Sequence, residues 1–270
     1  MAQVEDLIAH SLDADPVLMP VLDYLLQDIE VLGGDPQQIV GMVRPLKMTG
    51  GVRLVLDLGC GKGVIATALA AELGLHVTGI DAFQPFIDEA RARASVMGIS
   101  EQCLFEIADM RQLVNRLPPF DMVLYVACGR VFGDMQQTIA ALRTFVRPRG
   151  FIIIGDLCRV NGAAGANPDI PDHEAVARAL MSCGDRIVME KHGLTQEAEE
   201  AGVQATRILE RRARELMRLY PGLHASIWEY IETYRRDRAC RQGSLVPALW
   251  LVQKSDGTQR KGSNAEDQKG

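Results

Sequence analysis

Apolar and polar positions follow two different periods along the chain. In the central part, short continuous apolar runs, typical of parallel strands buried on both faces, alternate with longer stretches of helix formers. Strands that alternate with helices predict βαβ units and a parallel sheet with right-handed crossovers. The expected strands are 53–58, 75–80, 103–107, 121–126 and 151–156, and the expected helices are about 62–73, 83–97 and 134–146, the last ended by a turn at 147–150.

Helical periodicity dominates the N-terminal part of the chain. Residues 3–47 carry apolar positions at helical spacing, with Gly33-Gly34 as a stop. Asp35-Pro36 is typical of the cap and first turn of a further helix. This pattern predicts an N-terminal helical cap over residues 1–50, which either covers one edge of the sheet only or also closes a ligand site.

The alternating pattern changes after residue 157. A loop of small residues precedes a short helix at 172–183 and a sixth strand at 185–191. The seventh strand is expected only at 245–253, where Pro247 favours a position near an edge or at a bulge. The last two strands are therefore separated by about fifty residues.

Those intervening residues, about 195–243, predict a helical insertion. Their apolar positions repeat at helical spacing in two segments separated by Pro221-Gly222, so both helices have a face to bury. Residues 254–270 are polar and lack any periodicity, which predicts a disordered tail.

Three glycines follow the first strand at alternate positions, where the chain turns into a helix. Gly59, Gly61 and Gly63 have no Cβ, so the backbone can turn sharply and lie close to a ligand at the positive end of the helix. A dinucleotide site has G-x-G-x-x-G, in which the third glycine comes one residue later than Gly63 does here. Asp57 places a carboxylate at the end of the strand, where it repels a pyrophosphate and attracts an ammonium. The pattern favours a zwitterionic cofactor.

Acidic residues also end three further strands. Ligands bind beyond the carboxyl ends of the strands in doubly wound sheets, so Asp81, Asp109 and Asp156 are expected along one cleft. Asp81 can accept hydrogen bonds from two ribose hydroxyls, and Asp156 either orients an acceptor or caps a loop. The loop after the fourth strand should line the same cleft, and its Cys128 is more typical of a small packed hydrophobe than of a nucleophile or metalloid ligand.

Composition narrows the class of protein. The 270 residues, 47% hydrophobic and 24% charged, fit an ordinary globular domain with additions. A net charge of -6 gives no bulk electrostatic reason to expect a nucleic acid or a membrane as partner. The six cysteines form no C-x-x-C pair and no close cysteine–histidine cluster, so no metal site is predicted and reduced thiols in the cytoplasm are expected. No targeting or membrane segment is visible.

The stretch Asp57-x-Gly59-x-Gly61-x-Gly63 resembles motif I of the class I S-adenosylmethionine-dependent methyltransferases, and Asp81 matches motif II. The likeness covers about residues 51–193 and 245–253. It implies a Rossmann-like, doubly wound α/β fold whose seven-stranded sheet is mostly parallel with an antiparallel last strand. The insertion is similar to that of a bacterial group of small-molecule methyltransferases. The expected methyltransferase domain is 51–253.

The resemblance also implies roles for individual residues. S-adenosylmethionine would place its methionine part on the glycines, its ribose on Asp81 and its adenine near Asp109. The expected cofactor-binding residues are Asp57, Gly59, Cys60, Gly61, Gly63, Asp81, Ala82, Ala108, Asp109, Met110 and Val126. For the acceptor, the weak catalytic candidates are Tyr230, Tyr234 and Asp156, and no spacing selects a base among the tyrosines and His173, His192 and His224.

The expected function is methyl transfer to a small molecule, with the insertion as a lid over the acceptor side of the cleft. A helical hairpin beside the domain, or a contact in a homodimer, is the alternative for the insertion. Nine arginines from Arg207 to Arg241 motivate a nucleic-acid methyltransferase, but acidic neighbours interrupt the run. An NAD-dependent oxidoreductase is disfavoured by the early third glycine, and a non-catalytic binding protein stays open. The acceptor atom is not determined.

Overall fold

A seven-stranded sheet forms the middle of the computed structural model, which describes residues 2–48, 53–160, 170–240 and 244–256. The strand order is β3-β2-β1-β4-β5-β7-β6, and only β7 runs antiparallel to its neighbours. The predicted doubly wound fold is confirmed. The strands are β1 Leu54–Leu58, β2 His76–Asp81, β3 Cys103–Ile107, β4 Phe120–Val126, β5 Val146–Arg159, β6 Arg186–His192 and β7 Leu245–Gln253.

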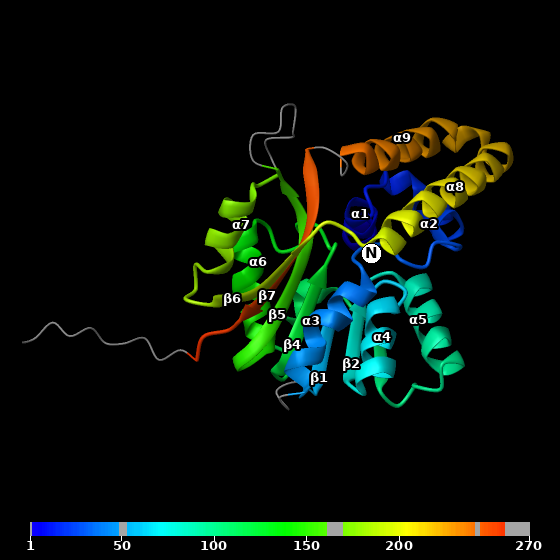
Figure 1. The fold of residues 1–270 in the computed structure, drawn as a ribbon. Helices are drawn as coiled ribbons and strands as arrows, with labels where there is room; N and C mark the ends of the chain where they lie inside the picture. Colours follow the sequence, from blue (N-terminus) through cyan, green and yellow to red (C-terminus); the bar gives the residue numbers. More distant parts are fainter. Residues whose placement is uncertain (1, 49–52, 161–169, 241–243, 257–270) are drawn as a thin grey trace, which may run out of the picture.

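Helices cover both faces of the sheet and one of its ends (Figure 1). The α-helices are α1 Ala2–Ser11, α2 Met19–Leu26, α3 Pro36–Met48, α4 Val64–Leu73, α5 Gln84–Val96, α6 Met135–Leu142, α7 His173–Leu180, α8 Gln196–Leu219 and α9 His224–Cys240. Short 3-10 turns are η1 Pro16–Leu18, η2 Met110–Leu113, η3 Arg143–Phe145 and η4 Pro221–Leu223. None of the helices in the described segments is long and apolar enough to cross a membrane.

The two faces of the sheet build two separate cores. Successive side chains of a strand point to opposite faces, so Val55 packs with α3, α4 and α5, whereas Leu56 packs with α6 and α7. A third core contains no strand residue. It joins α1, α2, α8 and α9 with Phe83 and Phe86 at the start of α5, and Figure 1 shows these helices grouped at one end of the sheet. The insertion therefore packs on the first two N-terminal helices.

One local prediction was wrong. The turn expected at 147–150 belongs to β5, which starts at Val146 because Phe120 of β4 already pairs with it ahead of a register shift. The strand with Pro247 lies between β5 and the edge strand β6, so the position predicted for it near an edge is confirmed. Proline is tolerated there because the β6 ladder ends one residue later, at Ala248.

The C-terminal residues expected as a tail are partly ordered. Lys254 donates through Nζ to the carbonyl of Arg143 at 2.7 Å, and the backbone N–H of Ser255 donates to Asp185 at 2.8 Å. The remaining part of the expected tail, 257–270, lies outside the described residues. The domain limits at 50 and 253 stay predictions.

Gly63 and Gly74 have similar backbone conformations but different surroundings. Replacing each by alanine therefore separates the effect of the left-handed conformation on stability from the effect of packing. Gly63 has a φ of +71°, and a Cβ there would lie 2.8 Å from both Ala90 and Phe105; Gly74 has a φ of +60° and no atom within 4 Å of that position. Gly74→Ala is expected to lower the free energy of unfolding by about 1 kcal/mol, the left-handed penalty. Gly63→Ala should cost about 2 kcal/mol more, because α5 and β3 must give way. Urea denaturation measures both, and equal losses would contradict this tight approach.

Candidate active site

A cavity of about 1110 Å³ lies beyond the carboxyl ends of the first four strands. Asp57 of β1, Asp81 of β2, Ala108 after β3 and Val126 of β4 line it. The strand order reverses between β1 and β4, so the cavity occupies the topological switch point at which doubly wound sheets bind ligands. Side chains of α1, α8 and α9 form the opposite wall.

Most of the residues singled out by the sequence line this cavity. Those that do are Asp57, Gly59, Cys60, Asp81, Ala82, Ala108, Asp109, Met110, Val126, Tyr230 and Tyr234. Those that do not are Gly61, Gly63, Asp156, His173, His192 and His224. Asp156 belongs to the β5 row of Ile152, Ile154 and Cys158, which faces the core under α6 and α7. The two glycines shape the turn and are covered by its neighbours.

The turn after β1 is held from below by β2. The backbone N–H groups of Gly59 and Cys60 donate to the carbonyl of Ile80 at 2.8 and 3.0 Å. Gly59 has a φ of +70°, and a Cβ on it would lie 2.5 Å from the sulfur of Cys128. The backbone is therefore pressed against β4, and the open side of the turn faces the cavity.

Asp57 is a buried acid without a partner for one of its oxygens. Its exposed fraction is 2%, and Oδ2 accepts no hydrogen bond from the described part of the chain. Burial, with a smaller effect from the negative charge of Asp81, raises the pKa of this carboxyl to about 7. Asp57 is also a lining residue of the cavity, and a buried acceptor without a partner there fits a cationic ligand group.

Asp81 joins β2 to the glycine turn. Oδ2 accepts from the N–H of Gly61 at 2.9 Å, and Oδ1 accepts from the N–H of Phe83 at 2.9 Å. Burial raises its pKa, while these backbone donors oppose the change. Each carboxylate oxygen keeps acceptor capacity for hydroxyls in the cavity.

Asp109 is already paired within the described chain. It caps η2 by accepting from the N–H of Arg111 at 3.0 Å, and its two oxygens also accept from the guanidinium of the same residue. These hydrogen bonds hold the pKa of Asp109 below its usual value. The carboxylate is therefore ionised, and a ligand that hydrogen-bonds to it would do so alongside Arg111.

The cysteine in the loop after β4 is a buried hydrogen-bond donor. The thiol of Cys128 donates to the carbonyls of Leu58 at 3.1 Å and Val126 at 3.4 Å. Burial raises its pKa well above the ordinary thiol value. It stays protonated, so this geometry favours the packed hydrophobe over the nucleophile.

The two candidate tyrosines, Tyr230 and Tyr234, lie near Asp13 in the lining of the cavity. Sequence reasoning missed Asp13. Tyr230 is buried, and its pKa is raised by burial and by the nearby Tyr234 and Asp13. The phenol of Tyr230 therefore stays protonated and is unsuited to act as a base. Asp13 lies in the turn after α1, where no sequence pattern connects it with α9.

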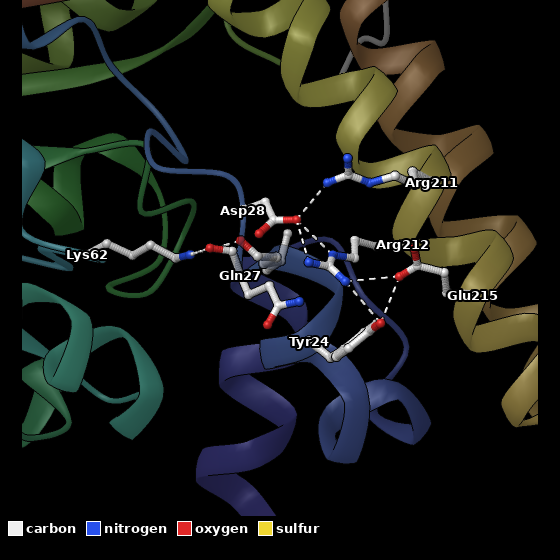
Figure 2. A network of polar contacts seen from close by, with 8 residues as sticks. Tyr24, Gln27, Asp28, Lys62, Arg211, Arg212 and Glu215 are labelled. Carbon is white, nitrogen blue, oxygen red and sulfur yellow. Dashed lines mark hydrogen bonds and ion pairs between the residues drawn. The ribbon is translucent and has the colours of Figure 1, made fainter.

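Lys62 connects the glycine turn to the helices above it. Nothing in the sequence indicated this contact, since Lys62 lies between two motif glycines. Its buried ammonium donates to the carbonyls of Leu26 at 2.8 Å and Gln27 at 3.0 Å, at the end of α2, and pairs with Glu89 at 3.0 Å. Figure 2 shows the next residue, Asp28, facing the opposite way.

The other side of this joint is formed by α8. Asp28 accepts from Arg211 and Arg212, and Arg212 also donates to Tyr24 of α2 and to Glu215 (Figure 2). The C-terminal end of α2 thus links the turn below the cavity with the helix above it.

Comparisons with known proteins agree with this geometry. A family model described as a methyltransferase domain matches residues 55–150. The chain is 28% identical to 27-O-demethylrifamycin SV methyltransferase of Amycolatopsis mediterranei (strain S699) over 191 residues, 69% of each chain. It is 36% identical over 110 residues to a ubiquinone biosynthesis O-methyltransferase of Rickettsia canadensis (strain McKiel), which is 40% of this chain and less than half, 44%, of that protein.

A solved structure extends the likeness beyond the matched domain. The SAM-dependent methyltransferase from Thiobacillus denitrificans, in complex with S-adenosyl-L-homocysteine, superposes with a TM-score of 0.67 at 16% identity, over 86% of this chain and 97% of that chain. Identity this low shows the fold alone. The match to a methyltransferase domain over residues 55–150 and the methyltransferase names of the relatives support the class I S-adenosylmethionine-dependent methyltransferase that the sequence predicted.

The joint at Lys62 gives a stability prediction. Lys62→Met leaves the carbonyls of Leu26 and Gln27 without their donor, and we expect the free energy of unfolding to fall by about 2–3 kcal/mol. The matched variant Glu89→Gln keeps both carbonyl bonds and loses only a half-exposed ion pair, so it should cost less than about 1 kcal/mol. Urea denaturation compares them. Equal losses would mean that the carbonyl contacts contribute nothing.

Proposed function

We propose that this methyltransferase acts on a small molecule with a largely apolar body, which binds under α1, α8 and α9. The single observation that carries the proposal is the continuity of the cavity from the glycine turn to the lid helices. Its volume of about 1110 Å³ exceeds the usual range for one drug-sized ligand, so a cofactor and an acceptor can occupy it together.

The cofactor end of the cavity fits S-adenosylmethionine. The open, buried oxygen of Asp57 would accept from the ammonium of its methionine part, and Asp81 would accept from the ribose hydroxyls. Ala108 and Met110 would pack on the adenine, with Asp109 beside them sharing its charge with Arg111. When bound, the cofactor supplies a methyl group on a sulfonium, an electrophile that needs no further activation.

The chain's own contribution is positioning and exclusion of water. Residues of α1 and α8, such as Leu7, Ile8 and Ile208, give the acceptor side apolar walls, while Tyr230 and Tyr234 offer hydroxyls to a polar atom of the acceptor. Holding two reactants in line accounts for much of the rate of a direct displacement. No side chain on this side is assigned as a base, because burial keeps Tyr230 protonated.

The relatives and the charges both support a small acceptor. The two relatives carry the names of O-methyltransferases for a rifamycin and for ubiquinone biosynthesis. In the arginine-rich insertion, Arg211 and Arg212 pair with Asp28, and Arg214 and Arg235 pair with Glu210. Four of the nine arginines are thus engaged in ion pairs within the fold, which argues against a continuous phosphate-binding face.

The cofactor assignment predicts a pH dependence of binding. Because an ammonium binds the ionised form of Asp57, the affinity for S-adenosylhomocysteine should fall about tenfold for each pH unit below about 7. The same raised pKa means that the folded ligand-free chain holds the proton more tightly than the unfolded chain. Its stability should therefore fall as the pH rises from about 4 to about 7.

Two variants separate the roles of the acids in calorimetry with S-adenosylhomocysteine. Asp57→Asn should bind weakly with a flat profile. Asp81→Ala should lose about ten- to a hundredfold in affinity, since two hydroxyl contacts disappear. The pH profile of binding by Asp81→Ala should keep its slope but move to lower pH. The reason is that the negative charge of Asp81, the smaller of the two effects that raise the pKa of Asp57, is gone. A pH-independent wild type would rule out the ammonium contact with Asp57.

The acceptor assignment is tested by release of S-adenosylhomocysteine. Purified protein and S-adenosylmethionine are incubated with apolar small molecules that carry a hydroxyl or amine, with tRNA and with a protein extract. Turnover with a small molecule is expected, whereas methylation of RNA or protein alone would overturn the proposal.

A matched pair of lid variants then locates the acceptor. Ile208→Trp fills the acceptor side and should lower turnover of the small-molecule acceptor more than tenfold, with S-adenosylhomocysteine affinity within about threefold. Val203→Trp, on the same helix but 39% exposed and outside the cavity lining, should leave both unchanged. Equal turnover in the two variants would remove α8 from the acceptor site.

A further inference from the structure

Three metal-binding side chains meet outside the cavity, at the β6 edge of the sheet. His173 is the first residue of α7, and Glu190 and His192 lie two apart on β6, so they share one face. One ligand atom from each lies within 4.8 Å of the other two, and none of the three residues lines the cavity. The sequence predicted no metal site, because it shows no metal-binding spacing here.

The distances fit a single ion. Nε2 of His173 lies 2.8 Å, and Nε2 of His192 3.4 Å, from the same oxygen of Glu190, Oε2. A tetrahedral zinc with bonds of about 2.0–2.1 Å needs ligand atoms about 3.3 Å apart. The three ligand atoms all lie within 4.8 Å of one another, so side-chain rotation that brings each pair to this separation would give three ligands and leave one position for water.

The surroundings hold these ligands and favour a cation. The indole of Trp250 is buried and stacks on His173 with a centroid distance of 6.3 Å and a 28° angle, and it meets His192 edge-on at 6.5 Å. Asp172 caps α7 and so fixes the start of the helix that carries His173. Burial raises the pKa of the Cys158 thiol, and the negative charges of Asp156, Glu190 and Asp172 raise it further, as expected in a region of negative potential.

We propose that His173, Glu190 and His192 form a binding site for a divalent transition metal, with zinc the best match to two imidazoles and a carboxylate. The ion would clip α7 to the edge strand. It would also fix the end of β6, since the next residues, Gly193 to Thr195, line the cavity and lead into α8. The site is separate from the methyl-transfer chemistry and does not depend on the acceptor.

Trp250 provides a local reporter. The chain has two tryptophans, so Trp228→Phe, on the half-exposed face of α9, leaves Trp250 as the only one. Metal-free protein of this variant, with any polyhistidine tag removed, is titrated with Co²⁺ and followed by tryptophan fluorescence and visible absorption, and then with Zn²⁺ in competition. We expect quenching that saturates at one equivalent, a tetrahedral cobalt spectrum and its loss on adding zinc.

Variants of the three proposed ligands, compared with control variants, test whether the metal binds at this site. His173→Ala, His192→Ala and Glu190→Gln should each weaken cobalt binding by at least about a hundredfold, since even outer partners of metal ligands contribute ten- to a hundredfold. His76→Ala and His224→Ala, elsewhere on the fold, should change nothing. If wild type shows no saturable binding below about 100 µM, or binding survives the ligand variants, the three residues are only a hydrogen-bonded group. Saturation without a tetrahedral spectrum would likewise reject this coordination.

Discussion

Close packing of the turn between β1 and α4 is the constraint on which the site depends. On one side the turn lies against the sulfur of Cys128, and on the other Gly63 touches the side chains of α5 and β3. Asp81 and the carbonyl of Ile80 then hold its N–H groups. With three sides occupied, the remaining side faces the cavity, which is also lined by Asp57, the buried acid with an unpartnered oxygen.

The helices above the cavity depend on the same turn. Lys62 donates a hydrogen bond to the carbonyl of the last residue of α2, Leu26. Asp28 lies two residues further along the chain and accepts hydrogen bonds from arginines of α8 (Figure 2). Because α1, α2, α8 and α9 share one core, the N-terminal cap and the insertion act as a single cover, though they are about two hundred residues apart. The two ends of the cavity proposed for the cofactor and the acceptor are therefore connected through the buried Lys62 and the ion pairs of Asp28, which suits a reaction that relies on positioning.

Charged groups in the interior and on the surface are treated differently in this fold. Burial raises the pKa values of the neighbouring Asp57 and Asp81, which disfavours their ionisation in the ligand-free chain. Four arginines of the insertion are instead paired with Asp28, which follows α2, and with Glu210 of α8. At the β6 edge a single carboxylate, that of Glu190, contacts the imidazoles of His173 and His192.

The sequence by itself determined the elements and their chemistry wherever the signal was local. Hydrophobic runs marked the strands, the glycine spacing marked the turn, and acids at the ends of neighbouring parallel strands had to meet at one edge, which brought Asp57, Asp81 and Asp109 to one cavity. Only the tertiary structure decided the early start of β5 and the face to which Asp156 points, since these depend on pairing with distant strands. It also brought Asp13 to the tyrosines of α9, Lys62 to α2 and His173 to β6. Contacts between residues far apart in the chain have no period or spacing to reveal them, because they follow from how whole elements pack.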